Sequence, residues 1–195
     1  EPSTGPSTTA SAAASALASR FLSREDSAHL LMVGTGALAP HLAAAHCTVR
    51  PIRRVTVWGR DAGHARAMAA KLDLKGVTVA VAEDLAKAVG AADIVSCATL
   101  ATAPLIRGAW LEPGQHLDLV GGCTPAMREA DDEAVRRAAG AGGVYVDTRG
   151  GATKEAGDIV QPLANGTLEA AAIKADLFDL CRGTVAVRRG SARLT

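Results

Sequence analysis

The amino-acid sequence predicts an α/β fold with a doubly wound parallel sheet. Short apolar segments rich in β-branched residues alternate with segments of helical periodicity along most of the 195 residues. The first apolar segment ends in a glycine-containing turn, and a helical pattern follows that turn. This alternation is typical of parallel strands that are joined by right-handed helical crossovers and covered on both faces.

The expected elements follow from the spacing of apolar residues. An alanine-rich stretch predicts a first helix over residues 9–22, because alanine is the strongest helix former. The expected strands span residues 30–33, 54–58, 77–81, 94–97, 116–120 and 144–146. The expected helices between and after them span residues 38–47, 62–72, 82–89, 131–139 and about 157–166.

The turn after the first strand contains the pattern G-x-G-x-x-A, formed by Gly34, Gly36 and Ala39. In a Rossmann-like domain the first glycine permits the tight turn, the second admits a pyrophosphate, and the third small residue lets the helix pack closely. Free N–H groups and the positive end of the helix dipole then stabilise the diphosphate. The residues expected to hold it are Gly34, Thr35, Gly36, Ala37 and Leu38. The alternative is a tight strand–helix turn without a ligand.

The residues after the second strand bear on the choice between NAD(H) and NADP(H). An Asp or Glu at this place binds the ribose 2′-hydroxyl of NAD, whereas a 2′-phosphate prefers Arg. This chain has Trp58, Gly59 and Arg60 here, and the Arg60 guanidinium can bind a phosphate or stack on adenine. The sequence therefore favours NADP(H), with NAD(H) as the alternative. Arg60 can instead be an exposed residue paired with Asp61, and Asp61 can cap the helix that follows.

Ligands of such sheets bind where the parallel strands end. Ala98 and Thr99 follow the fourth strand, and Val120 and Gly121 stand at the end of the fifth. We expect these four residues to pack along the cofactor toward its nicotinamide ring. Each segment taken alone is equally consistent with an ordinary loop, since glycine and small polar residues are common wherever a strand ends.

Composition and charge exclude several classes of partner. The formal net charge is +1, and no basic block points to a nucleic acid or an anionic membrane surface. No apolar run is long enough to span a bilayer. The four cysteines and five histidines do not have the spacing of a metal site. A cytoplasmic protein without a metal, nucleic-acid or membrane partner is therefore expected.

Several segments, in order along the chain, resemble the ornithine cyclodeaminase/mu-crystallin family. The resemblance lies in residues 33–39, 57–60 and 92–99, in Val120-Gly121 with Pro125 and residues 127–129, and in residues 146–147 and 154–158. It extends from about residue 7 to about residue 182. The activities of the family share one step, in which a hydride passes between nicotinamide and a carbon that bears nitrogen.

The resemblance implies an NAD(P)-dependent oxidoreductase or cyclodeaminase-like lyase of amino-acid metabolism, with an amino acid or imine as substrate. Members of the family are homodimers, and a separate substrate and dimerisation domain is built from both ends of their chain. We therefore expect residues 1–24 to form a helix linked to that domain, which is largely absent here. Residues 25–170 are expected to form the dinucleotide-binding domain, and residues 171–195 to return toward the substrate domain.

Two positions depart from the pattern of the cyclodeaminases in the family. Ala10 stands where the motif R-T-A-A supplies an arginine that grips the substrate carboxylate, and alanine offers no such charge. Cys123 stands where these enzymes place an aspartate that acts on the substrate amine. We expect Cys123 to line the pocket, and no catalytic residue is assigned. The predicted function is a ketimine reductase or cyclodeaminase-like enzyme, and the alternative is a catalytically decayed NADP-binding protein of the mu-crystallin type.

Overall fold

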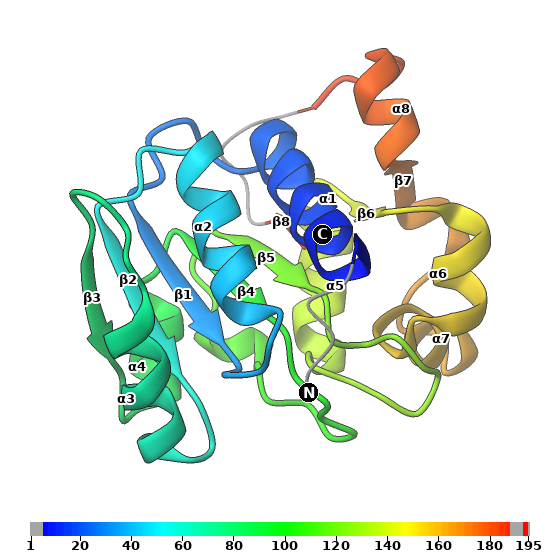
Figure 1. Ribbon diagram of the computed structural model, residues 1–195. Coiled ribbons are helices and arrows are strands. Elements are labelled where there is room, and N and C mark those ends of the chain that lie inside the picture. The colour runs from blue at the N-terminus through cyan, green and yellow to red at the C-terminus, as the bar shows by residue number, and fades with distance from the viewer. Residues whose placement is uncertain (1–5, 188–192, 195) are drawn as a thin grey trace.

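The computed structural model describes residues 6–187 and 193–194, in which helices and strands alternate (Figure 1). The strands are β1 (His29–Val33), β2 (Arg54–Trp58), β3 (Thr78–Val81), β4 (Ile94–Cys97), β5 (His116–Leu119), β6 (Val144–Val146), β7 (Ile173–Asp176) and β8 (Arg193–Leu194). They form one sheet in the order β3-β2-β1-β4-β5-β8-β6-β7, and all the pairings between them are parallel. The first five strands follow the Rossmann-like order 3-2-1-4-5, so the predicted fold class is confirmed.

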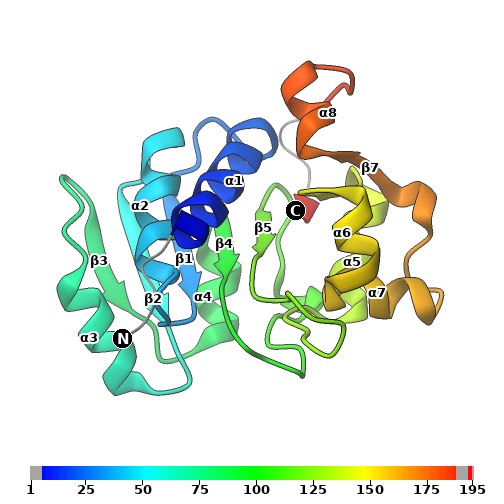
Figure 2. The same cartoon turned by 45° about the vertical axis from the view of Figure 1, so that its right-hand side comes forward.

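Helices cover both faces of this sheet, with α3 beside the edge strand β3 at one end and α8 beside β7 at the other (Figures 1 and 2). The helices are α1 (Pro6–Leu22), α2 (Ala39–Val49), α3 (Ala62–Lys71), α4 (Leu85–Ala91), α5 (Asp132–Ala141), α6 (Arg149–Glu155), α7 (Gly157–Ala164) and α8 (Leu177–Arg182). Two short 3-10 turns lie at η1 (Gly108–Trp110) and η2 (Ala170–Ala172). In the described part of the chain, none of the helices has the length and apolar character needed to cross a membrane.

The central strand β1 is buried on both of its faces. Leu31 and Val33 pack in one apolar cluster with residues of α4 and α5. Leu30 and Met32 pack in a second cluster with residues of α2 and α3. Successive residues of a strand point to opposite faces, so the unbroken apolar run of β1 reflects a sheet that is covered on both sides.

The structure differs from the sequence-based expectations mainly after residue 146. The sequence predicted the helix α7 but not α6, β7, α8 or β8. The helix expected over residues 82–89 begins only at Leu85, because Asp84 is its N-cap and accepts a hydrogen bond from the Lys87 amide at 3.1 Å. The expected division of the chain at residues 24 and 170 stays a prediction, and residues 1–5, 188–192 and 195 of its outer parts lie outside the described residues.

Candidate functional site

The turn that follows β1 is packed tightly against the ends of two neighbouring strands. Gly34 has φ +116°, a left-handed conformation that favours glycine. A Cβ at this position would overlap the carbonyl oxygen of Ala98, which follows β4. The Gly34 amide donates to the carbonyl oxygen of Trp58, at the end of β2, at 2.9 Å. Gly34 therefore brings the ends of β1, β2 and β4 together.

The four residues between Gly34 and the start of α2 have backbone amides without a partner among the described residues. The amides of Thr35, Gly36, Ala37 and Leu38 donate no hydrogen bond to any described residue, whereas the Ala39 amide donates to the carbonyl oxygen of Gly36 at 3.1 Å. Gly36 is exposed, and a Cβ there would meet nothing within 4 Å. This turn therefore offers unpaired donors and open space at a helix N-terminus, which are the two properties a diphosphate requires.

The segment after β2 lies against the same turn. A Cβ on Gly59 would be 2.8 Å from Cγ2 of Thr35, so a larger residue here would require the Thr35 side chain to move. Arg60 is exposed, and no ion pair joins it to Asp61 within the part of the chain that is described. Asp61 instead caps α3, because its side chain accepts from the His64 amide at 2.8 Å, a bond that lowers the Asp61 pKa. The capping role predicted for Asp61 is therefore confirmed, and Arg60 is free to bind a ligand.

The ends of β4 and β5 complete this edge of the sheet. The Ala98 amide donates to the Val33 carbonyl oxygen, and the Val120 amide donates to the Cys97 carbonyl oxygen, both at 2.9 Å. A Cβ on Gly121 would overlap the backbone of Thr99, so the two loops touch. The structure thus brings together the residues that the sequence predicted as cofactor contacts. They are Gly34, Thr35, Gly36, Ala37, Leu38, Trp58, Gly59, Arg60, Ala98, Thr99, Val120 and Gly121.

A buried carboxylate, Glu129, lies beneath these two loops, and sequence reasoning gave it no role. Its Oε1 accepts hydrogen bonds from the amide and the hydroxyl of Thr99, both at 2.7 Å. Its Oε2 accepts from the Gly121 amide at 2.8 Å. Burial raises the pKa of Glu129 to about 7, against the opposing effect of these three hydrogen bonds. A single glutamate in a loop gives no periodic pattern. The sequence therefore indicated Glu129 only as part of the segment 127–129, one of the segments that resemble the family.

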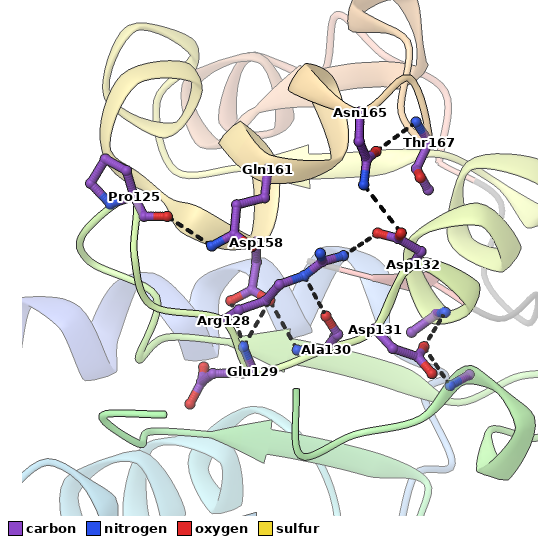
Figure 3. Close-up of polar contacts among 12 residues, drawn as sticks. Pro125, Arg128, Glu129, Ala130, Asp131, Asp132, Asp158, Gln161, Asn165 and Thr167 are labelled. Atoms are coloured by element: carbon purple, nitrogen blue, oxygen red, sulfur yellow. Dashed lines mark hydrogen bonds and ion pairs between the residues drawn. The ribbon is translucent and has the colours of Figure 1, made fainter. Parts of the chain in front are cut away.

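Asp158, at the start of α7, forms hydrogen bonds with the backbone at Glu129 (Figure 3). Its Oδ1 accepts from the amides of Glu129 and Ala130, both at 2.9 Å. Burial raises the Asp158 pKa, while these two hydrogen bonds oppose the rise. A Cβ on Gly157 would overlap the Met127 carbonyl oxygen, so α7 can begin only with glycine at this contact. The start of α7 and the loop before α5 are therefore locked together.

A cavity of about 360 Å³ opens beside the same edge, between β5, β6, α1 and α6. Its walls include Val120 and Cys123, but not the turn of residues 34–38. Asp118, another wall residue, accepts hydrogen bonds from Ser15 and, at 2.7 Å, from Ser96. Burial alone would raise the pKa of Asp118, but the hydrogen bond from His46, the nearby imidazoles of His46 and His116, and the hydrogen bond from Ser15 together hold the pKa below its ordinary value.

The two positions that depart from the cyclodeaminase pattern are both exposed. Ala10 lies in the first turns of α1, and Cys123 lies in the loop after β5. The Cys123 Sγ is 3.6 Å from the Met127 Sδ, and the residue lines the cavity. Within the described residues, no group of three or more His, Cys, Asp or Glu side chains is arranged to hold a metal ion.

The fold and the free amides of the turn define a Rossmann-like NAD-binding domain. Residues 4–195 match the Ornithine cyclodeaminase/mu-crystallin family, and the chain belongs to that family. The Delta(1)-pyrroline-2-carboxylate reductase of Paracoccus denitrificans is 42% identical over 175 residues, which cover 89% of this chain and 54% of that protein. The ketimine reductase mu-crystallin of Macropus fuliginosus is 32% identical over 169 residues, which cover 87% of this chain and 49% of that protein.

A solved structure of the Thermococcus litoralis Delta(1)-pyrroline-2-carboxylate reductase, in complex with NADH and L-proline, superimposes with a TM-score of 0.90 at 30% identity. The match covers 98% of this chain and 59% of that one. The chain thus spans about half the length of the curated relatives it matches. The resemblance to the family, which the sequence segments indicated, is confirmed.

Proposed function

We propose that this chain is the cofactor-binding part of an NAD(P)H-dependent imine reductase that acts on a small cyclic imine bearing a carboxylate. Two relatives above 30% identity are named as reductases of pyrroline-2-carboxylate and of ketimines. The residues at this site favour reduction over ornithine cyclisation, because Cys123 occupies the position of the cyclodeaminase aspartate. A thiol does not supply the fixed negative charge that a carboxylate holds beside an amine.

The observation that carries this proposal is the open turn between β1 and α2. Four amides that donate to no described residue are offered to a diphosphate, those of Thr35, Gly36, Ala37 and Leu38. The empty space over Gly36 admits the ligand to within contact of the backbone. Bound NADPH or NADH would supply the hydride for the reduction. The amides would orient the cofactor so that its nicotinamide end lies along Ala98 and Val120 at the sheet edge.

Arg60 supports a preference for NADP(H) over NAD(H). The residue is exposed, and Asp61 is engaged as the helix cap instead of neutralising it. A guanidinium at this position fits a 2′-phosphate, and no carboxylate follows β2 at the place that binds the 2′-hydroxyl in NAD enzymes. NAD(H) is the second candidate, because the T. litoralis relative was solved with NADH.

We infer that the whole protein is a homodimer, and that residues outside 25–170 connect the cofactor domain to a substrate and dimerisation domain. The group that binds the substrate carboxylate is assigned to that domain, since Ala10 offers no charge for it. A protein that binds NADP(H) without turnover is the second candidate function, and the exposed Ala10 and Cys123 are the observations that favour it.

Two measurements on the purified protein test these proposals. Oxidation of NADPH in the presence of cyclic imine carboxylates would support the reductase, whereas tight NADPH binding without turnover across the panel would support the binding protein. Arg60→Ala should weaken NADPH binding about tenfold or more and leave NADH binding nearly unchanged, because only NADPH has the phosphate. Arg53→Ala, which also removes an exposed arginine, is the matched control. Equal losses for both cofactors in Arg60→Ala would reject the phosphate role.

A further inference from the structure

Glu129 is fully buried, and its carboxylate connects two loops that are separate in sequence. Thr99 follows β4 and Gly121 follows β5, and both donate to this one side chain. A Cβ on Gly121 would overlap both the Glu129 carboxylate and the Thr99 backbone, so the three residues form one packed unit. The Glu129 side chain therefore fixes the two loops relative to each other.

The hydrogen bonds at this carboxylate suit its ionised form. All three partners donate, and the Thr99 hydroxyl itself accepts from the Ala101 amide at 3.3 Å. A protonated carboxyl could keep all three contacts only if the Thr99 hydroxyl turned from donor to acceptor.

Within the described part of the chain, no ion pair neutralises the ionised form of Glu129. Cys97 of β4 and Asp158 of α7 interact electrostatically with it, and neither is a cation. The guanidinium of Arg128 points away from the Glu129 carboxylate, toward Asp132 and the carbonyl oxygen of Ala130 (Figure 3). At a pH above about 7, where Glu129 is mostly ionised, an anion thus lies directly behind the backbone of Thr99 and Gly121.

We propose that Glu129 is a positioning residue that sets the shape of the loops around the nicotinamide end of the cofactor and holds a negative charge behind that end. This inference rests on the proposed function, in which the bound cofactor lies next to Thr99 and Gly121. The reduced nicotinamide ring is neutral, and it becomes cationic once it has given its hydride to a substrate carbon. A fixed carboxylate behind the ring therefore favours the oxidised cofactor and promotes hydride donation to an imine.

The test compares how tightly the protein binds the oxidised and reduced forms of the same cofactor. NADPH binding is followed by its fluorescence and NADP⁺ binding by competition, in the wild type, in Glu129→Gln and in Asp132→Asn. Asp132→Asn removes a negative charge from the same segment without touching Thr99 or Gly121. Glu129→Gln should weaken NADP⁺ relative to NADPH about fivefold, the order expected for two charges several ångströms apart in a partly hydrated site. Asp132→Asn should leave the ratio unchanged.

A purely structural role for Glu129 would weaken both forms of the cofactor equally, and that result would overturn the inference. At a pH well above 7, where the carboxylate stays ionised, Thr99→Val calibrates such a change, because it removes one hydrogen bond to Glu129 and keeps the charge. If Glu129→Gln does not fold, the pH dependence of cofactor binding by the wild type tests the same charge. The preference of the wild type for NADP⁺ should rise with pH through about 7 as Glu129 ionises, and a flat preference contradicts the proposal. Absence of any cofactor binding would instead reject the proposed function.

Discussion

Substitutions at Gly34 and Gly36, in the turn after β1, separate the effect on stability from the effect on cofactor binding. Gly34→Ala places a methyl group into the backbone of Ala98, with the new Cβ only 3.0 Å from the Ala98 carbonyl carbon. It also forces alanine into a conformation with φ +116°. Both effects act on the folded state alone, because the unfolded chain has neither the contact nor the restraint.

The expected loss in the free energy of unfolding is about 3 kcal/mol, the sum of about 1–3 kcal/mol for overpacking and about 1–2 kcal/mol for the left-handed backbone. For a chain of this length that loss corresponds to a fall in Tm of roughly 6–12 °C. Urea denaturation followed by circular dichroism measures the free energy, and differential scanning calorimetry measures Tm.

Gly36→Ala is the matched control, two residues further along the same turn. Its Cβ would meet nothing within 4 Å, so we expect the free energy of unfolding to change by less than about 0.5 kcal/mol. The same methyl group would occupy the space over the free amides and should weaken NADPH binding by about tenfold or more. The reasoning is refuted if Gly34→Ala is as stable as the wild type, or if Gly36→Ala binds NADPH normally.

Two further changes test other parts of the structure. Arg50→Ala removes a buried guanidinium that donates to the carbonyl oxygens of Ser19 and Ser23 at the end of α1. We expect a loss of about 3 kcal/mol in urea denaturation, and a midpoint equal to that of the exposed control Arg53→Ala would contradict this role. Glu129 has a folded-state pKa of about 7 against its ordinary 4.5, so its stabilising contribution is complete below about pH 4.5 and lost as pH rises through about 7. That change amounts to about 3 kcal/mol, and Glu129→Gln should remove it from the pH dependence of stability, whereas identical curves for the two proteins would count against a buried, titrating carboxylate.

The first half of the fold could be predicted from the sequence because its signals are local. The apolar run of β1 and the glycines after it indicate a buried strand and a tight turn within about ten residues. The helix α6 was missed because Gly150 and Gly151 interrupt the helical pattern. Thr148 nevertheless starts that helix, as its hydroxyl accepts from the Gly151 amide at 3.3 Å. Gly150 and Gly151 are thus part of a capped helix.

The sequence does contain a signal for the helix α8, but it is a capping motif and not an apolar periodicity. Asp176 and Asp179 form a capping box, in which each side chain accepts from the backbone amide of the other. The roles of Glu129 and Asp158 had no such signal, because their partners lie 8 to 30 residues away in the chain. Contacts of that range depend on how the strands are ordered in the sheet, and spacing in the sequence does not record that order.

The central claim is that the amides of residues 35–38 bind the diphosphate of a nicotinamide cofactor. The most direct test is an NMR titration of the ¹⁵N-labelled protein with NADPH, followed by amide hydrogen exchange. We predict saturable shifts at Thr35, Gly36, Ala37 and Leu38, together with slower exchange of these four amides. Saturation with NADPH that leaves these four signals and their exchange rates unchanged would contradict the account.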